Sequence, residues 1–244
     1  MRASIFRLVG TISVCCALAP VLAQGPAANK LASFNVSPLR IDIAREQGAS
    51  QFFVRNDSPD QLPLQVRLFA WSQVGGKDIF EPSQDFIVSP SIIRIDPDRT
   101  QTFHVIGQRP FSAAEQASYR VVIDQLPSAS ASAAGATQTR LRVTVPLYAG
   151  GDVAQPAKLN FKIDKQTLII GNDGGRSARI NDLKLLVGDQ EIVLAMNAGP
   201  RAVLAGSSVN WTLPQIFDCT GEPIRVIARI DQKNADVATL QTCT

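Results

Sequence analysis

The chain has 244 residues, of which 45% are hydrophobic and 18% are charged, and its formal net charge is +3 at pH 7. Without Arg2 and Arg7, which precede the first apolar run, the formal charge falls from +3 to +1. This near-neutral balance excludes the strongly basic character of a nucleic-acid-binding protein, so we expect no DNA or RNA partner.

The N-terminus has the pattern of a secretory signal peptide. Two arginines precede an apolar run from Leu8 to Leu18, and Ala19–Ala23 supplies the small residues of a cleavage site. We therefore expect a signal peptide over residues 1–23, and no later apolar run approaches the roughly 20 residues that span a bilayer. A lipoprotein interpretation of Cys15 and Cys16 is weaker, because a small residue should precede the modified cysteine.

Residues 24–150 alternate apolar and polar side chains with a period of two, which is the pattern of half-buried β-strands. No long amphipathic helix is predicted. Seven or so strands over about 120 residues, with turn signals between them, are typical of an immunoglobulin-like sandwich. The clearest predicted strands are 39–43, 53–56, 64–71, 92–95, 100–105, 119–126 and 140–148.

Small residues and a proline over Ala149–Pro156 have the composition of a connector, and a second series of strands follows. We expect a smaller β-sandwich over residues 151–244, with turns at 172–175 and 231–234. The predicted fold class is therefore all-β, with two sandwich domains. The predicted strands of the second domain are 158–164, 167–171, 180–187, 191–196, 208–213, 223–230 and 237–243.

The sequence carries no motif for catalysis or cofactor binding. Its single histidine, His104, excludes a multi-histidine zinc site, and a surface or interdomain position is expected for it. Carboxylates are scattered over predicted turns and give no positive signal for a glycosidase pair, although such pairs form in space. Gly171–Gly175 lacks the Lys-Ser/Thr and the helix of a phosphate loop, which favours a tight turn. We expect no enzyme activity, metal, cofactor or small-molecule substrate.

Cys219 and Cys243 are the cysteines that follow the predicted leader. In an exported, oxidising setting, a disulfide that closes the last hairpin is the first interpretation. Two separate buried thiols are the alternative, because the sequence does not fix the geometry that a bridge needs.

The predicted strand 140–148 follows a loop rich in Ser, Ala and Gly, and its two faces differ. A guanidinium group suits the bidentate binding of a carboxylate, and we expect Arg40 on the outward face of the first strand. If the first and last strands are neighbours, Arg40 and Arg142 would converge on one anion; ordinary solvated arginines are the alternative. One face holds Arg140, Arg142 and Thr144, and the other holds Leu141, Val143, Val145 and Leu147.

Short segments spread over the mature chain are specific in their order and spacing: Phe34–Arg40, Val54–Asn56, Trp71–Gln73, Ser89–Pro97, Thr100–Gln101, Glu115–Arg120, Leu126–Pro127, Val145–Tyr148, Gly171–Gly174, Leu204–Gly206 and Trp211–Pro214. Together they resemble the periplasmic pilus chaperones of the chaperone/usher pathway, the PapD-like family. The ending Val145–Tyr148 is more similar to the Leu-Pro-Val-Phe of the archaic, Csu-like branch than to the Leu-Phe-Tyr-Arg-Pro of the other branch.

The resemblance implies two immunoglobulin-like β-sandwich domains arranged at an angle, in a non-enzymatic periplasmic protein. Such a chaperone binds, stabilises and caps pilus or fimbrial subunits and delivers them to an outer-membrane usher. A subunit lacks the last strand of its own sandwich, and the chaperone lends a strand that completes it, which is donor-strand complementation. Pilus subunits and the usher are the implied partners, and self-association without client would hide the exposed strand.

The resemblance also implies that two basic residues anchor the C-terminal carboxylate of the subunit. Arg40 matches the first of them by position. The second is a lysine in the other branch, and Thr144 stands at its place here, with Arg142 as the nearest substitute on the same face and Arg140 as the next. The threonines of the implied donor strand offer little apolar area, so either the aliphatic residues insert or the client groove is shallow. The implied donor residues are Thr137, Thr139, Leu141, Val143 and Val145.

Four positions concern the implied contact between the domains. Glu115 and Asp218 match the acidic members of an interdomain ion-pair network in the family, whereas Tyr148 stands where the other branch has an arginine. His104 stands where members of the family often have an arginine, three residues after Gln101. Glu115, Asp218 and His104 are therefore the expected interdomain residues.

Two other classes of protein are compatible with an exported all-β chain. A structural pilus subunit or adhesin usually has an N-terminal donor extension and one incomplete domain, whereas two complete sandwiches are predicted here. A secreted β-sandwich enzyme or carbohydrate-binding module favours clustered aromatics or carboxylates, and aromatic residues make up 6% of this chain. The chaperone is therefore the first interpretation.

Overall fold

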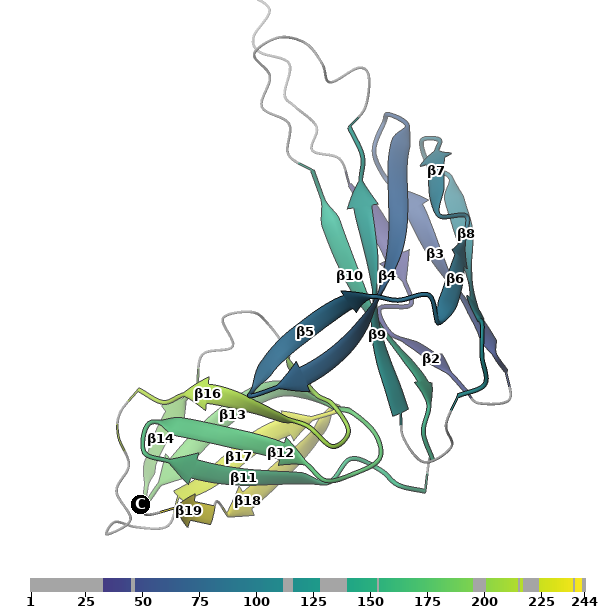
Figure 1. Cartoon of the computed structure of the whole chain (residues 1–244). Coiled ribbons are helices and arrows are strands. Elements are labelled where there is room, and N and C mark those ends of the chain that lie inside the picture. The colour runs from purple at the N-terminus through teal and green to yellow at the C-terminus, as the bar shows by residue number, and fades with distance from the viewer. Residues whose placement is uncertain are drawn as a thin grey trace, which may run out of the picture. The chain divides into compact units, whose positions relative to one another are not determined.

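The structure is a computed structural model, and it describes residues 33–44, 47–111, 116–127, 140–152, 154–194, 201–214, 216, 224–238 and 240–242, with side chains as far as Ala235. Every regular element in these residues is a β-strand, which confirms the all-β prediction. Leu31–Thr244 form one compact unit that contains two sandwiches, each with its own apolar core (Figure 1). Within the described residues, no helix is long and apolar enough to cross a membrane.

The first sandwich consists of two sheets whose neighbouring strands are antiparallel, except that β2 runs parallel to β10. One sheet has the order β1 (Phe34–Ser37), β3 (Ala49–Asn56), β8 (Thr100–Gly107) and β6 (Phe86–Ser89). The other has the order β2 (Ile41–Ile43), β10 (Arg142–Gly150), β9 (Gln116–Gln125), β4 (Leu62–Val74) and β5 (Lys77–Pro82), and β7 (Ile92–Ile95) also pairs with β4.

Alternation along the strands directs one face of each sheet into a shared core. On β9, Tyr119, Val121 and Ile123 are at most 3% exposed, whereas the residues between them face outward. Phe52 and Phe103 stack in this core with ring centroids 4.9 Å apart. Burial of apolar area, at about 25 cal/mol per Å², therefore fixes which residues of β9 and β10 reach the outer face.

The predicted strand 39–43 is wrong at its beginning. Pro38, which has no N–H to donate to a ladder, separates β1 from β2, and Leu39 is 67% exposed in the bend that follows. Ile41 and Ile43 keep the alternation because both enter the core. Arg40 therefore lies in the bend before β2 and not within the first strand.

The second sandwich also has two sheets. Its four-stranded sheet has the order β16 (Ser208–Thr212), β12 (Thr167–Asn172), β11 (Leu159–Asp164) and β19 (Leu240–Thr242). The other has the order β14 (Gln190–Val193), β13 (Ala178–Val187), β17 (Ile224–Ile230) and β18 (Lys233–Ala238), and β15 (Arg201–Val203) also pairs with β13. The turn predicted at 231–234 is shorter, because Asp231 and Gln232 alone make it and Lys233 begins β18.

Each sandwich has a buried asparagine at the end of a strand, and three of the four hydrogen bonds of its side chain are of the same kind in both. The side-chain oxygen of Asn56 accepts from the N–H of Ser58 at 2.9 Å, and its Nδ2 donates to two backbone carbonyl groups. Asn172 accepts from the N–H of Gly174 at 3.0 Å and likewise donates to two carbonyl groups. Residues 172–175 therefore form the predicted turn, which the Asn172 side chain organises.

Two glutamines join the sandwiches through neutral hydrogen bonds. Gln73 Nε2 donates to the carbonyl oxygen of Ala202 at 2.9 Å, and its Oε1 accepts from the N–H of Leu204 at 2.9 Å. Gln116 Oε1 accepts from both the N–H and the hydroxyl of Ser177, each at 2.8 Å. Since these groups are buried, each glutamine satisfies polar atoms of the other sandwich that water does not reach.

An apolar cluster and a hairpin complete this joint. The tip of the β4–β5 hairpin contacts the second sandwich, where Arg201 Nη2 donates to the carbonyl oxygen of Gly76 at 2.7 Å. Tyr148 contributes a buried ring, so the residue that stands in place of an arginine serves an apolar contact. The cluster consists of Trp71, Tyr148, Ala202 and Leu204.

Candidate functional site

Strand β10 has one edge that is only partly covered. On one side it pairs with β9 along its whole length, from Arg142 to Gly150. On the other side, among the described residues, β2 pairs only with Leu147–Ala149, where Ile41 lies opposite Leu147. The backbone groups of β10 from Arg142 to Pro146 therefore form an open edge to which a further strand can add.

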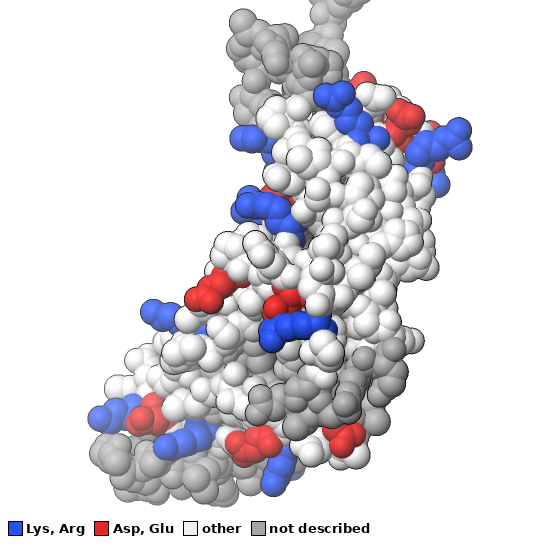
Figure 2. Space-filling view, turned by 45° about the vertical axis from the view of Figure 1, so that its right-hand side comes forward, with Lys and Arg blue, Asp and Glu red and all other residues white. Residues whose placement is uncertain are grey.

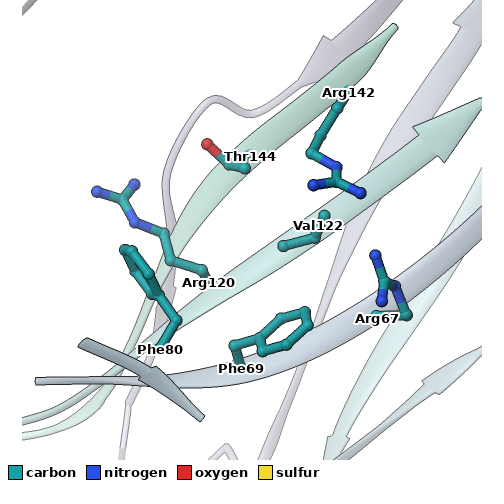
Figure 3. Close-up of a pocket in the computed structure, with 7 residues that line it drawn as sticks. All are labelled: Arg67, Phe69, Phe80, Arg120, Val122, Arg142 and Thr144. Carbon is teal, nitrogen blue, oxygen red and sulfur yellow. The ribbon is translucent and has the colours of Figure 1, made fainter. Parts of the chain in front are cut away.

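A pocket of about 370 Å³ lies on the outer face of the same sheet, next to this edge (Figure 3). Its residues come from four neighbouring strands, β10, β9, β4 and β5, which the register brings side by side. The sequence positions are far apart, so the pocket exists only once the sheet is formed. The lining residues are Arg67, Phe69, Phe80, Arg120, Val122, Arg142 and Thr144.

Two of the three pocket arginines share one carboxylate. Arg67 donates from Nη2 to Asp124 Oδ2 at 2.6 Å, and Arg142 donates from Nε to Asp124 Oδ1. Burial of the Asp124 carboxyl raises its pKa, but the hydrogen bonds from Arg142 and Arg67 outweigh burial and hold the pKa below its usual value. Asp124 is therefore ionised at neutral pH and compensates one of the two positive charges.

Arg120 has no such carboxylate. Its guanidinium carbon lies 3.8 Å from the centroid of the Trp71 ring, and no described Asp or Glu is within ion-pair distance. Burial lowers the pKa of Arg120 and outweighs the nearby Tyr148 and Asp78, which raise it, although the group stays protonated at neutral pH. Arg120 is therefore a half-buried cation without a direct salt bridge to a described residue, and Asp78, which accepts a hydrogen bond from Trp71, is the carboxylate that acts on it from further away.

Arg40, the first predicted anchor, is already engaged. It donates to Asp42 from Nε at 2.7 Å and from Nη2 at 2.9 Å, and it lies 4.4 Å from the Tyr148 ring centroid. The hydrogen bond to Asp42 raises the pKa of Arg40. An anion that binds Arg40 must therefore compete with Asp42, on a side chain that is 34% exposed.

The expected convergence of Arg40 and Arg142 is not seen, although their strands are neighbours. In the parallel register, Ile41 faces Leu147, so Arg40 lies at the level of Pro146. Arg142 is four residues further along β10, which is about 13 Å at the usual rise of a strand. The two arginines bind separate carboxylates instead.

The predicted donor residues differ in how accessible they are. Leu141 is 36% exposed, Val143 is half-buried against the core, and Val145 is 1% exposed within it. Thr144 lines the pocket, and Arg140 is exposed just before β10. Thr137 and Thr139 lie outside the described residues.

The expected interdomain and disulfide residues are placed only in part. His104 is exposed on β8, where its strand neighbours Gln51 and Ser89 also belong to the first sandwich. The remaining four, Glu115, Asp218, Cys219 and Cys243, lie outside the described residues. In the described part of the chain, no three His, Cys, Asp or Glu side chains gather as a metal site.

Charged groups on the face drawn in Figure 2 are scattered. In the view of Figure 2, Lys and Arg side chains occur singly or beside Asp and Glu, and most of the described surface in that view is uncharged. The concentration of three arginines around one pocket is therefore a local feature of the sheet that contains β10.

The sequence prediction missed Arg67, Arg120, Phe69 and Phe80 as site residues. Period-two alternation could have placed Arg120 outward on its strand, because Tyr119 and Val121 are apolar neighbours. The sequence does not contain the register, which sets Arg120 between Phe69 and Pro146. Without that register no pocket can be predicted.

Comparison with known proteins identifies the fold. Residues 33–149 match the family model described as pili and flagellar-assembly chaperone, PapD N-terminal domain. The match confirms the resemblance to the PapD-like chaperones, and β1 to β10 are the strands of the PapD-type domain. The matched model describes an assembly-chaperone domain and not an enzyme domain.

Solved structures extend the likeness to both sandwiches. The chain is similar to one in the CsuC–CsuE chaperone–tip adhesion subunit pre-assembly complex of Acinetobacter baumannii, with a TM-score of 0.68, 21% identity, and coverage of 86% of this chain and 99% of that one. It also resembles a chain of the Salmonella enterica SafA pilin–SafB chaperone complex, with a TM-score of 0.63, 13% identity, and coverage of 87% of this chain and 98% of that one. The Escherichia coli chaperone DraB matches with a TM-score of 0.61, 13% identity, and coverage of 86% of this chain and 98% of that one. Among curated proteins, none matches the sequence.

Proposed function

We propose that the protein is a periplasmic chaperone that binds, stabilises and caps pilus subunits by donor-strand complementation and delivers them to an outer-membrane usher. The open edge of β10 beside an arginine-rich pocket carries this proposal, because it offers a backbone ladder and a place for a negative charge. The likeness to chaperones that were solved with a tip subunit or a pilin supports a subunit as partner.

The donor strand in this proposal is β10 with the residues that precede it. Its open edge would supply main-chain hydrogen bonds to the incomplete sandwich of the subunit. Leu141 offers the most accessible apolar side chain of the described donor residues, whereas Val145 already serves the core of the chaperone. Insertion would therefore begin at Leu141 and Val143, preceded by Thr137 and Thr139.

The anchor for the C-terminal carboxylate of the subunit is proposed to be basic residues on the outer face of this sheet. Arg40 stays the first of them by position, and Thr144, Arg142 and Arg140 are the candidates for the second. Arg120 joins this set, because it is the pocket arginine without a carboxylate partner among the described residues.

Several parts of the prediction belong to the same proposal. The signal peptide over residues 1–23 would direct the chain to the periplasm, where a disulfide between Cys219 and Cys243 would form. Domains over 24–150 and 151–244 would be joined by the two glutamines, with Glu115, Asp218 and His104 as further interdomain residues. Self-association in the absence of client would cover the open edge of β10.

Coexpression with a candidate pilus subunit in a periplasm, followed by copurification, tests the proposal. We expect a stable complex with wild type, and loss of the complex with a folded Arg40→Ala variant, because Arg40 is proposed to hold the client carboxylate. An undiminished complex with that variant would refute the Arg40 anchor. Failure of every subunit encoded beside the gene to copurify with wild type would refute the chaperone function itself.

A further inference from the structure

Strand β5 ends its sheet and has an open edge of its own, apart from that of β10 (Figure 1). It pairs with β4 on one side, from Lys77 to Pro82, and with no described strand on the other. In the order of the sheet, β9 and β4 separate β5 from β10. All the residues of β5 are exposed, so a strand that joins this edge meets backbone groups that no described strand covers.

The turn before β5 fixes which of its backbone groups point outward. Both residues of this two-residue turn have positive φ, and the residues that flank it, Val74 and Lys77, lie opposite each other. The flanking residues of such a turn form a hydrogen-bonded pair, so Lys77 and every second residue after it direct their N–H and C=O groups toward β4. The backbone groups of Asp78 and Phe80 therefore point to the open edge.

The side chains of β5 face two ways. One face lies toward the joint between the sandwiches, where Phe80 stacks on Trp71. The other face holds Lys77, Ile79 and Glu81, and Ile79 is 39% exposed there. Among the described residues neither Lys77 nor Glu81 has an ion-pair partner, and about 13 Å of strand separates them from each other. An exposed isoleucine is thus flanked, at equal spacing, by one unpaired positive charge and one unpaired negative charge.

We infer that β5 is an interface between two copies of this chain, which pair antiparallel about a two-fold axis at Ile79. In this register Asp78 of each copy forms a hydrogen-bonded pair with Phe80 of the other, because the backbone groups of these residues point outward. Ile79 then meets Ile79 of the other copy, and Lys77 meets Glu81 of the other copy at both ends. These are the non-hydrogen-bonded positions, where side chains across an antiparallel pair come closest.

The two neighbouring registers are less favourable. One sets Asp78 against Asp78 of the other copy, and the other register sets it against Pro82, which has no N–H to donate. The ladder is also limited in length, because Gly76 already forms a bridge with Val209 of the second sandwich. Two strands of five residues make a small interface, so we expect a weak dimer that salt weakens further. The open edge of β10 stays free in this dimer.

Sedimentation velocity of the purified full chain, without any partner protein, tests this interface. We expect a monomer–dimer equilibrium. Glu81→Lys would set Lys77 against a lysine at both ends, and it should raise the dissociation constant by about fivefold or more. Combining it with Lys77→Glu exchanges the two charges and should restore the wild-type value. Leu141→Asp, next to the open edge of β10, is the matched control and should leave the equilibrium unchanged.

A cysteine on the two-fold axis gives a direct readout. In the inferred register the Cα atoms of the two copies of Ile79 are about 4.5 Å apart, within the range that a disulfide spans. Mild oxidation should therefore link two copies of Ile79→Cys far more completely than two copies of wild type. Ile87→Cys, which alters an exposed residue of the edge strand β6, should behave like wild type.

Three results would overturn the inference. A chain that stays monomeric at every concentration would leave Lys77 and Glu81 as charges that keep this edge unpaired. A dimer that Leu141→Asp dissolves and Ile79→Cys does not link would place self-association at β10. A dimer that responds to Glu81→Lys but is not restored by the charge exchange would exclude the pairing of these two residues. All variants are measured in the free chain, so the outcome does not depend on whether the protein captures a pilus subunit.

Discussion

Gln73 offers the sharpest test of how the two sandwiches are held together. Its side chain is 9% exposed, and it bonds to the carbonyl oxygen of Ala202 and to the N–H of Leu204, both at 2.9 Å. Gln73→Met keeps nearly the same length and volume but removes both bonds to the second sandwich, together with the bond from Nε2 to Asp78 Oδ1 at 2.8 Å within the first. A buried polar group left without a partner costs about 1–3 kcal/mol, and two are left here. We therefore expect Gln73→Met to lower the free energy of unfolding by about 2–6 kcal/mol.

Two measurements check this value. Urea unfolding gives the change in free energy, and amide hydrogen exchange at Leu204 gives a local readout, because Gln73 Oε1 accepts from that N–H. Gln65→Met is the matched control, since it makes the same exchange on the same strand, where the partners Asp124 and Ile92 belong to the first sandwich. Faster exchange at Leu204 is expected in Gln73→Met alone. The reasoning fails if both variants unfold alike and Leu204 stays protected.

Other consequences follow from single side chains. Asn56→Ala and Asn172→Ala each remove four hydrogen bonds, so each should lower the free energy of unfolding, measured in urea, by about 2–4 kcal/mol. A decrease of less than about 1 kcal/mol, the cost of one unsatisfied buried group, would contradict the role assigned to these asparagines. Burial, and to a smaller extent the hydrogen bond that the Tyr119 hydroxyl donates to Asp85, raise the pKa of Tyr119 to about 12. Because the folded pKa is above the unfolded value of about 10, this tyrosine stabilises the fold fully below pH 10 and loses that contribution as pH rises through about 12. Spectrophotometric titration should therefore show no Tyr119 ionisation near pH 10, relative to Tyr119→Phe, until the chain unfolds. Gly76→Ala should destabilise the joint more than Gly75→Ala, because both have positive φ but a Cβ at Gly76 would lie 2.6 Å from a side chain of the second sandwich; equal thermal shifts would argue against the hairpin contact.

Period-two alternation predicted the fold class and most strands, because burial of one face leaves that pattern in the sequence. It missed β5 (Lys77–Pro82), which is exposed at every position and has no buried face to mark it. It also missed the four-residue β6 and the three-residue β15, which are too short for a period to show. Strands without a core face and strands of three or four residues are therefore the ones that sequence periodicity misses, and the first kind, β5, supplies Phe80 to the pocket.

The sequence predicted only those features of the candidate site that depend on a single strand. The face shared by Arg142 and Thr144 follows from alternation on one strand. The pairing of Arg40 with Asp42 was within reach of the same rule, since residues two apart share a face. The partners of Arg142 and Arg120 could not be predicted in this way. Asp124 becomes a neighbour of Arg142 only through the pairing of β9 with β10, and Trp71 becomes a neighbour of Arg120 only through the pairing of β9 with β4.

The joint between the sandwiches and the proposed client site use different chemistry for a physical reason. The joint between the sandwiches must persist with and without a client, and the amides of Gln73 and Gln116 provide bonds that need no counter-ion. The proposed client site needs the opposite, because a positive charge that the fold already neutralises attracts an anionic ligand only weakly. Arg120, stacked on Trp71 without a described carboxylate, is costly in the free chain and favourable once an anion arrives. Arg40, held by Asp42, is nearly neutral toward an approaching anion until that pair opens. In the proposed function, Arg40 therefore holds the client carboxylate once the client displaces Asp42, and Arg120 is a further cation that no salt bridge has to release.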